Sequence, residues 1–228
     1  MNISKNYKTI LYVILAILIV LGVGYAVFTN QQKQNNALNL SPSEVDQLPA
    51  AEKKRVLEVQ LKDLELQEQN LSADASSSNK FTVYIQLAEV RTALGNHQGA
   101  LDALGKISED RKGNTRVWQT YAQVYKNMGD LANAKQSIKT ALAIDNELPA
   151  SWILFFELNQ DIPSEELKAN YIQAIAVTKS NVAIMVSYAK FNERIGDKAT
   201  AVAAWETAIN GNPEKEVEYR AEIARLRQ

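Results

Sequence analysis

Few side chains in this sequence could perform acid–base or metal chemistry, and their spacing does not assemble a site. His97 is the only histidine, and no metal ligand or acid–base partner stands at a useful spacing from it. The nearest approaches to paired carboxylates are Glu165 with Glu166 and Asp102 with Glu109. Capping of a helix and solvation explain these carboxylates better than general acid–base catalysis does.

Motifs that would supply chemistry in another way are absent from the sequence. It has no phosphate loop, no G-x-S-x-G, no H-E-x-x-H and no calcium loop. It also has no cysteine, which excludes thiolate metal sites, cysteine nucleophiles and the acylated cysteine of bacterial lipoproteins. We therefore predict that the protein is not an enzyme, with no catalytic residues, no metal and no cofactor.

The composition favours a helical protein without a strong electric field. Lysine and arginine number 25 against 26 acidic residues, so bulk electrostatics do not favour nucleic-acid binding. Nine glycines and five prolines are few for 228 residues, whereas Ala, Leu, Glu, Lys and Gln are abundant. This composition predicts an all-α fold.

One stretch, residues 115–148, has a pattern typical of a packed helical hairpin. Its small residues would let two antiparallel helices approach closely while aromatic side chains fill the space between them. A Gly-Asp dipeptide stands where the turn is expected, because glycine adopts a left-handed conformation cheaply. The residues that define the pattern are Trp118, Tyr121, Ala122, Tyr125, Gly129, Asp130, Ala134, Ile138 and Ala141.

The same pattern recurs on both sides of this stretch and predicts four units, 81–114, 115–148, 149–181 and 182–215. The third unit is degenerate, because Phe156 replaces the small residue and Asp161-Ile162-Pro163-Ser164 replaces the glycine turn. Residues 214–228 predict one more helix, which would cap the open end of the stack.

These residues resemble the tetratricopeptide repeat (TPR), a helix-turn-helix unit about 34 residues long. The resemblance covers residues 81–228 and implies a right-handed α-solenoid of helical hairpins. It also implies a scaffold for protein–protein interactions, whose concave groove is lined by the first helix of each unit.

The groove that the resemblance implies would bind a peptide or a helix of another protein. The Lys/Asn clamp that some TPR domains use for a C-terminal carboxylate is not expected, because Ile85 and Glu89 occupy its first positions. The predicted lining residues are Ile85, Glu89, Gln119, Gln123, Lys126, Ile153, Glu157, Val186, Lys190, Glu193 and Arg194.

The N-terminal residues predict a membrane anchor. Residues 10–28 contain no charge, Asn, Gln or Pro, and a helix of this length approaches the ~30 Å thickness of the hydrocarbon core. We predict a cytoplasmic tail at 1–8 and a transmembrane helix at 9–28. Lys5 and Lys8 precede the helix, so the positive-inside rule leaves the repeats extracytoplasmic. The alternative is a signal peptide cleaved after Ala26, which would release a soluble exported carrier.

The segment between the membrane and the repeats is predicted to contain two linkers and one helix. Residues 29–49 read as a linker, within which residues 41–44 form a capping box. Residues 50–71 read as a stalk helix with a leucine seam that could join two copies, pack on the first repeat or remain a solvated stalk. The Ser-rich residues 72–80 read as a second linker.

Together these features predict a single-pass adaptor of a bacterial plasma (inner) membrane. Such an adaptor would recruit or stabilise proteins of an envelope, secretion or pilus-type assembly. A homo-oligomeric structural membrane protein, built through residues 50–71, is the alternative from another functional class.

Overall fold

The computed structural model describes residues 36–72, 74–107 and 109–228, and within these residues every regular element is a helix. This confirms the predicted all-α fold. The chain divides into two compact units, Met1–Asn70 and Leu71–Gln228. Among the described residues, no helix is both long enough and apolar enough to cross a bilayer. The predicted transmembrane helix at 9–28 lies outside the described residues.

The described part of the first unit contains α2 (Pro42–Asp46) and α3 (Ala50–Gln69), which pack on one another. The predicted capping box begins α2. The Ser41 backbone N–H donates to Glu44 Oε2 at 2.8 Å, and the Glu44 N–H donates to Ser41 Oγ. Gln60 of α3 donates to the carbonyl oxygens of Ala37 and Leu40, at 3.0 and 3.3 Å, and so holds the segment before α2. Part of the predicted linker 29–49 is therefore an ordered helical segment that packs on α3.

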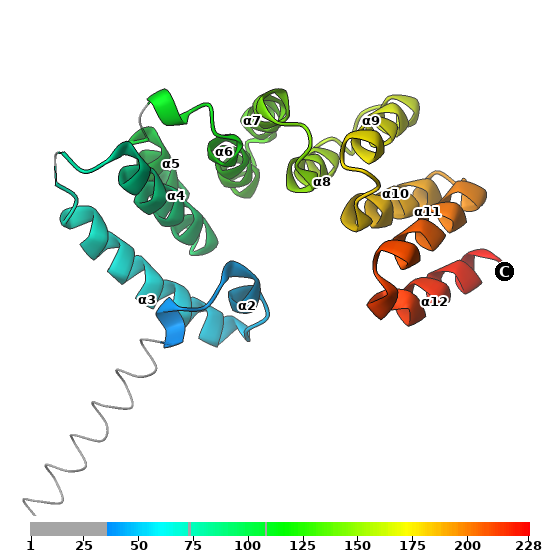
Figure 1. The fold of residues 1–228 in the computed structure, drawn as a ribbon, viewed down its shortest axis with the longest axis horizontal. Coiled ribbons are helices and arrows are strands. Elements are labelled where there is room, and N and C mark those ends of the chain that lie inside the picture. Colours follow the sequence, from blue (N-terminus) through cyan, green and yellow to red (C-terminus); the bar gives the residue numbers. More distant parts are fainter. Residues whose placement is uncertain (1–35, 73, 108) are drawn as a thin grey trace, which may run out of the picture. The chain divides into compact units, whose positions relative to one another are not determined.

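The second unit contains four consecutive helix pairs and a final helix (Figure 1). The pairs are α4 (Ser77–Ala93) with α5 (His97–Gly105), α6 (Thr115–Met128) with α7 (Leu131–Ile144), α8 (Pro149–Leu158) with α9 (Ser164–Val177), and α10 (Val182–Arg194) with α11 (Lys198–Gly211). The short 3-10 helices η1 (Glu109–Arg111) and η2 (Pro213–Lys215) lie in connections, and α12 (Glu216–Leu226) ends the array.

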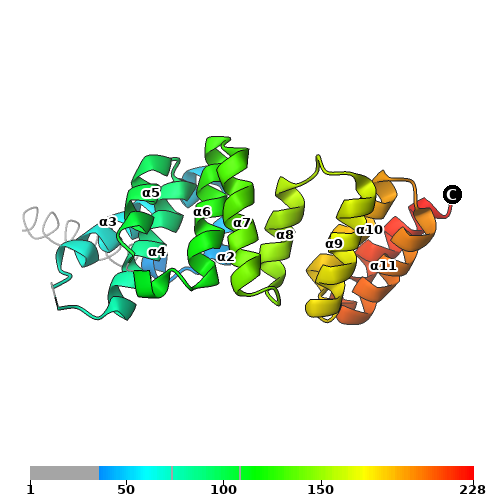
Figure 2. The same ribbon diagram turned by 90° about the horizontal axis from the view of Figure 1, so that it is seen from above.

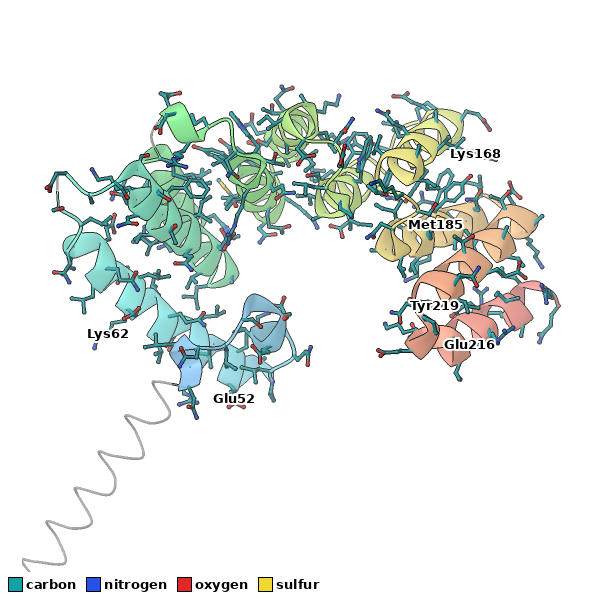
Figure 3. The ribbon with its side chains drawn as sticks, viewed as in Figure 1. Glu52, Lys62, Lys168, Met185, Glu216 and Tyr219 are labelled. Carbon is teal, nitrogen blue, oxygen red and sulfur yellow. The ribbon has the colours of Figure 1, made fainter. Side chains whose placement is uncertain are left out.

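The first helices of the pairs contact one another in order, α4 with α6, α6 with α8 and α8 with α10. They line one side of the second unit, as Figure 1 shows, and Figure 2 shows the pairs following one another along the array. α12 packs on α11, where the ring of Tyr219 lies 5.2 Å from that of Trp205. Tyr219 is labelled in Figure 3.

Left-handed glycines form the turns of the first, second and fourth pairs, as predicted. Gly95, Gly129 and Gly196 have φ of +81°, +79° and +83°. The residue after each glycine caps the second helix, because its side chain accepts a hydrogen bond from a backbone N–H three residues ahead. These N-caps are Asn96, Asp130 and Asp197.

Buried alanines let the helices of a pair approach one another. Ala122, Ala134 and Ala141 are 0% exposed, and α6 and α7 pack closely on one another. The indole N–H of Trp118 donates to the Lys112 carbonyl at 2.8 Å and so fixes the connection before the pair. Trp152 makes the equivalent bond in the next unit, to the carbonyl of Asn146 at 2.7 Å.

The start of α4 differs from the predicted start at residue 81. The Ser76 side chain accepts a hydrogen bond from the Asn79 N–H at 3.2 Å, so the helix begins at Ser77. A serine that caps a helix satisfies a backbone N–H that would otherwise have no partner. The end of the Ser-rich segment 72–80 is therefore the first turn of the repeat array.

Candidate partner-binding face

The side of the second unit lined by α4, α6, α8 and α10 carries the residues predicted to form the groove. We call it the first-helix face. One predicted residue does not lie on its surface, because Ile85 is only 1% exposed. Its position in the repeat suggested an exposed residue, but its branched apolar side chain is stabilised by burial. The prediction for Ile85 is corrected: it is a core residue.

Most charged residues of the first-helix face are bonded to a neighbouring unit. Glu89 of α4 forms a two-pronged ion pair with Arg116 of α6, with N···O distances of 2.9 and 2.7 Å. This hydrogen bond raises the pKa of Arg116 above its ordinary value. A bidentate ion pair fixes the relative orientation of its two side chains, so this pair aligns the first two units.

The second and third units are joined in the same way. Lys126 of α6 forms an ion pair with Glu157 of α8. Gln119 of α6 donates to the hydroxyl of Ser151 on α8 at 2.7 Å. Exposed ion pairs contribute little net stability in water, so their main effect here is to set the register between neighbouring helices.

Charged residues at the C-terminal end of the face also bond to other residues of the second unit. Glu193 of α10 accepts a hydrogen bond from the indole N–H of Trp205 at 2.8 Å and pairs with Arg225 of α12. The bond to Glu193 raises the pKa of Arg225. Arg194 bonds to the side-chain oxygen of Gln160 and lies 5.6 Å from the ring centre of Phe191.

Besides the buried Ile85, four predicted residues have no bond to a neighbouring unit. Lys190 of α10 is exposed and has no ion-pair or hydrogen-bond partner among the described residues. Ile153 and Val186 are partly buried against the core and present apolar surface. Gln123 bonds only within its own helix, to Asn127 at 2.8 Å. Among the described residues of the face, Lys190 therefore has neither an ion-pair nor a hydrogen-bond partner and lies beside apolar surface, whereas Arg194 bonds to the neutral side chain of Gln160.

The candidates for acid–base or metal chemistry remain apart in the structure. His97 begins α5 and is partly buried, and Glu165 and Glu166 lie exposed in the first turn of α9. No group of three or more His, Asp or Glu side chains that could hold a metal ion occurs within the described ranges.

Sequence reasoning missed the bonds between units. The paired positions lie about one repeat apart: 27 residues separate Glu89 from Arg116, and 31 separate Lys126 from Glu157. A search for opposite charges at this spacing would have raised these pairs as candidates. Spacing alone does not show which side chains reach one another.

The chain resembles known proteins in sequence and in fold. Residues 91–154, from the end of α4 into α8, match the family model described as tetratricopeptide repeat. No curated protein matches the sequence.

Three solved structures resemble the fold at low sequence identity. A thermophilic TPR protein from Thermus thermophilus is 17% identical, with a TM-score of 0.55, over 85% of this chain and 98% of that one. A MamA crystal structure is 14% identical, with a TM-score of 0.53, over 74% and 97%. A chain of the APC/C hetero-tetramer Cut9-Hcn1 is 12% identical, with a TM-score of 0.51, over 78% of this chain and 39% of that one.

The fold is therefore that of a TPR solenoid, and residues 91–154 carry the sequence signature of the repeat. Solenoids of this class present extended surfaces to other proteins.

Proposed function

We propose that the protein is a membrane-anchored TPR adaptor whose first-helix face binds another protein. The observation that carries the proposal is the difference between Lys190 and the other charges of that face. Glu89, Arg116, Lys126, Glu157 and Glu193 are each satisfied within the array. Lys190 is exposed beside apolar surface and is available to an acidic group of a partner.

The cellular setting of the proposal comes from the sequence. The apolar residues 9–28, preceded by Lys5 and Lys8, support a single-pass anchor with the repeats on the extracytoplasmic side. An adaptor there would recruit or stabilise components of an envelope, secretion or pilus-type assembly. The Cut9-Hcn1 hetero-tetramer is a precedent for such a fold within a larger complex.

Crosslinking in membranes tests this proposal on the full-length protein. We would compare the parent with Lys190→Glu and with the control Lys139→Glu, which reverses an exposed charge on α7. We expect the parent and the control to capture the same partner and Lys190→Glu to lose it, since like charges repel at the contact. Capture of that partner by all three proteins would contradict a role for Lys190.

The same experiment addresses the two alternatives. Capture of the chain alone would favour a homo-oligomer, although Leu57 of the predicted seam is only 7% exposed within a single chain. A mature N-terminus after Ala26 would instead favour the exported carrier.

A further inference from the structure

The third helix pair is assembled differently from the other three. The backbones of α4 and α5, of α6 and α7, and of α10 and α11 come close to one another at many positions. Those of α8 and α9 come close at only a few positions, and α9 also makes fewer backbone contacts with α10 than α7 makes with α8. We call residues 159–181, which comprise α9 and the connections on both sides of it, the third-pair junction.

Aromatic rings fill the space between α8 and α9. Phe156 of α8 stands where Ala122 stands in the second pair, and it stacks on Tyr171 of α9 with ring centres 3.6 Å apart. Tyr171 in turn lies 5.3 Å from Tyr188 and 5.0 Å from Phe191 of α10. Aromatic rings can pack in offset-stacked or edge-to-face arrangements, whereas closely approached helices interlock ridge into groove.

The connection within this pair also lacks the glycine turn of the other pairs. Residues 159–163 join α8 to α9 without a glycine. After α9, Lys179 and Ser180 have φ of +55° and +57°, a conformation that is strained for residues with a β-carbon. Strain of this kind concentrates at segments that change conformation.

Two polar side-chain contacts hold the connection between α8 and α9 at the surface. Lys135 of α7 pairs with Asp161 at 2.6 and 2.8 Å, and this bond lowers the pKa of Asp161. Arg194 of α10 bonds to Gln160. Gln160 and Asp161 are exposed, so these two polar contacts are accessible to water and contribute less stability than core packing does.

We infer that the third-pair junction is a hinge between two more rigid blocks, α4–α8 and α10–α12. The helices of each block interlock, while the blocks meet where α8 contacts α10 and through α9, which adds stacked rings and exposed polar contacts. Bending there changes the distance between α8 and α10, and so the spacing between Ile153 and Lys190. This inference rests on the packing alone and stands whether or not the first-helix face binds a partner.

The sequence has no cysteine, so spin labels can be attached to introduced cysteines alone. Pulsed electron–electron double resonance on the full-length protein then measures the distance between two labels. Spin labels at Lys139→Cys and Ala203→Cys would report across the junction, from α7 to α11. Labels at Gln86→Cys and Ala150→Cys would report over the same number of repeats within one block, from α4 to α8. All four positions are exposed on helices.

We expect the distance distribution across the junction to be about twice as wide as the reference distribution, as for two bodies joined by a hinge. Asp161→Asn, which removes the charge that holds Lys135, should widen or shift the first distribution and leave the reference unchanged. Equal widths in the two pairs, or no response of the junction pair to Asp161→Asn, would overturn the inference.

Discussion

Asp130 and Asp197 occupy equivalent places in two turns, each directly after a left-handed glycine. Each carboxylate accepts a hydrogen bond from a backbone N–H at the start of the following helix. Asn96 does the same in the first pair, accepting from the Gly99 N–H at 3.0 Å. A neutral side chain can therefore serve as the cap, and the two carboxylates add a charge whose effect depends on pH.

Replacement of Asp197 by asparagine should make the folding stability less dependent on pH in the acid range. Hydrogen bonds from the Thr200 backbone and hydroxyl, and the pair with Lys168, lower the pKa of Asp197 in the folded protein. A carboxyl group whose pKa is lowered by folding stabilises the folded protein at pH values above its ordinary pKa. This contribution is lost as the pH falls through the pKa of the folded state.

Thermal unfolding followed by circular dichroism between about pH 6 and pH 3 covers the ordinary carboxyl range. The midpoint of the parent should fall more steeply than that of Asp197→Asn. Parallel curves for the two proteins would show that this carboxylate is not linked to folding.

At the scale of the helix pair, the size of one side chain decides how closely two helices approach. Ala122 is 0% exposed between α6 and α7, which pack closely. Phe156 holds the same position in the third pair, where the helix backbones stay apart. Overpacking and wider spacing are the two possible responses to a large residue at this position, and the third pair shows the second.

Ala122→Leu should therefore destabilise the protein by about 1–3 kcal/mol, because α6 and α7 leave no room for the added carbons. The matched control is Ala132→Leu, an exposed position on α7, which should change stability by less than about 0.5 kcal/mol. Urea unfolding measures both free energies. Similar values for the two variants would mean that the α6–α7 contact tolerates separation.

At the scale of the whole second unit, α12 closes the C-terminal end of the array. Tyr219, Ile223 and Leu226 are at most 7% exposed on its inner face. Its outer face is mostly polar and includes Val217, which is 86% exposed. A solenoid needs such an end, because the last pair would otherwise leave apolar surface in water.

Removal of residues 216–228 should lower the free energy of unfolding by several kcal/mol, at about 1.5–3 kcal/mol for each large apolar side chain that loses its burial. Val217→Ser is the control in the same helix and should have almost no effect. Chemical denaturation together with light scattering would measure both the loss of stability and any aggregation. An unchanged denaturation midpoint in the shortened protein would contradict the capping role of α12.

The sequence by itself determined the local features of the array. Residue type alone encodes a left-handed glycine turn, an Asx cap or a small residue at a helix contact, and their recurrence predicted the helical hairpins. Only the tertiary structure decided which side chains meet between units. It placed Ile85 in the core, paired Glu89 with Arg116, and left Lys190 unpaired. The physical reason is that local signals depend on neighbouring residues in the chain. Pairing between repeats depends on helix spacing and rotation, which the packing of every side chain in the interface sets together.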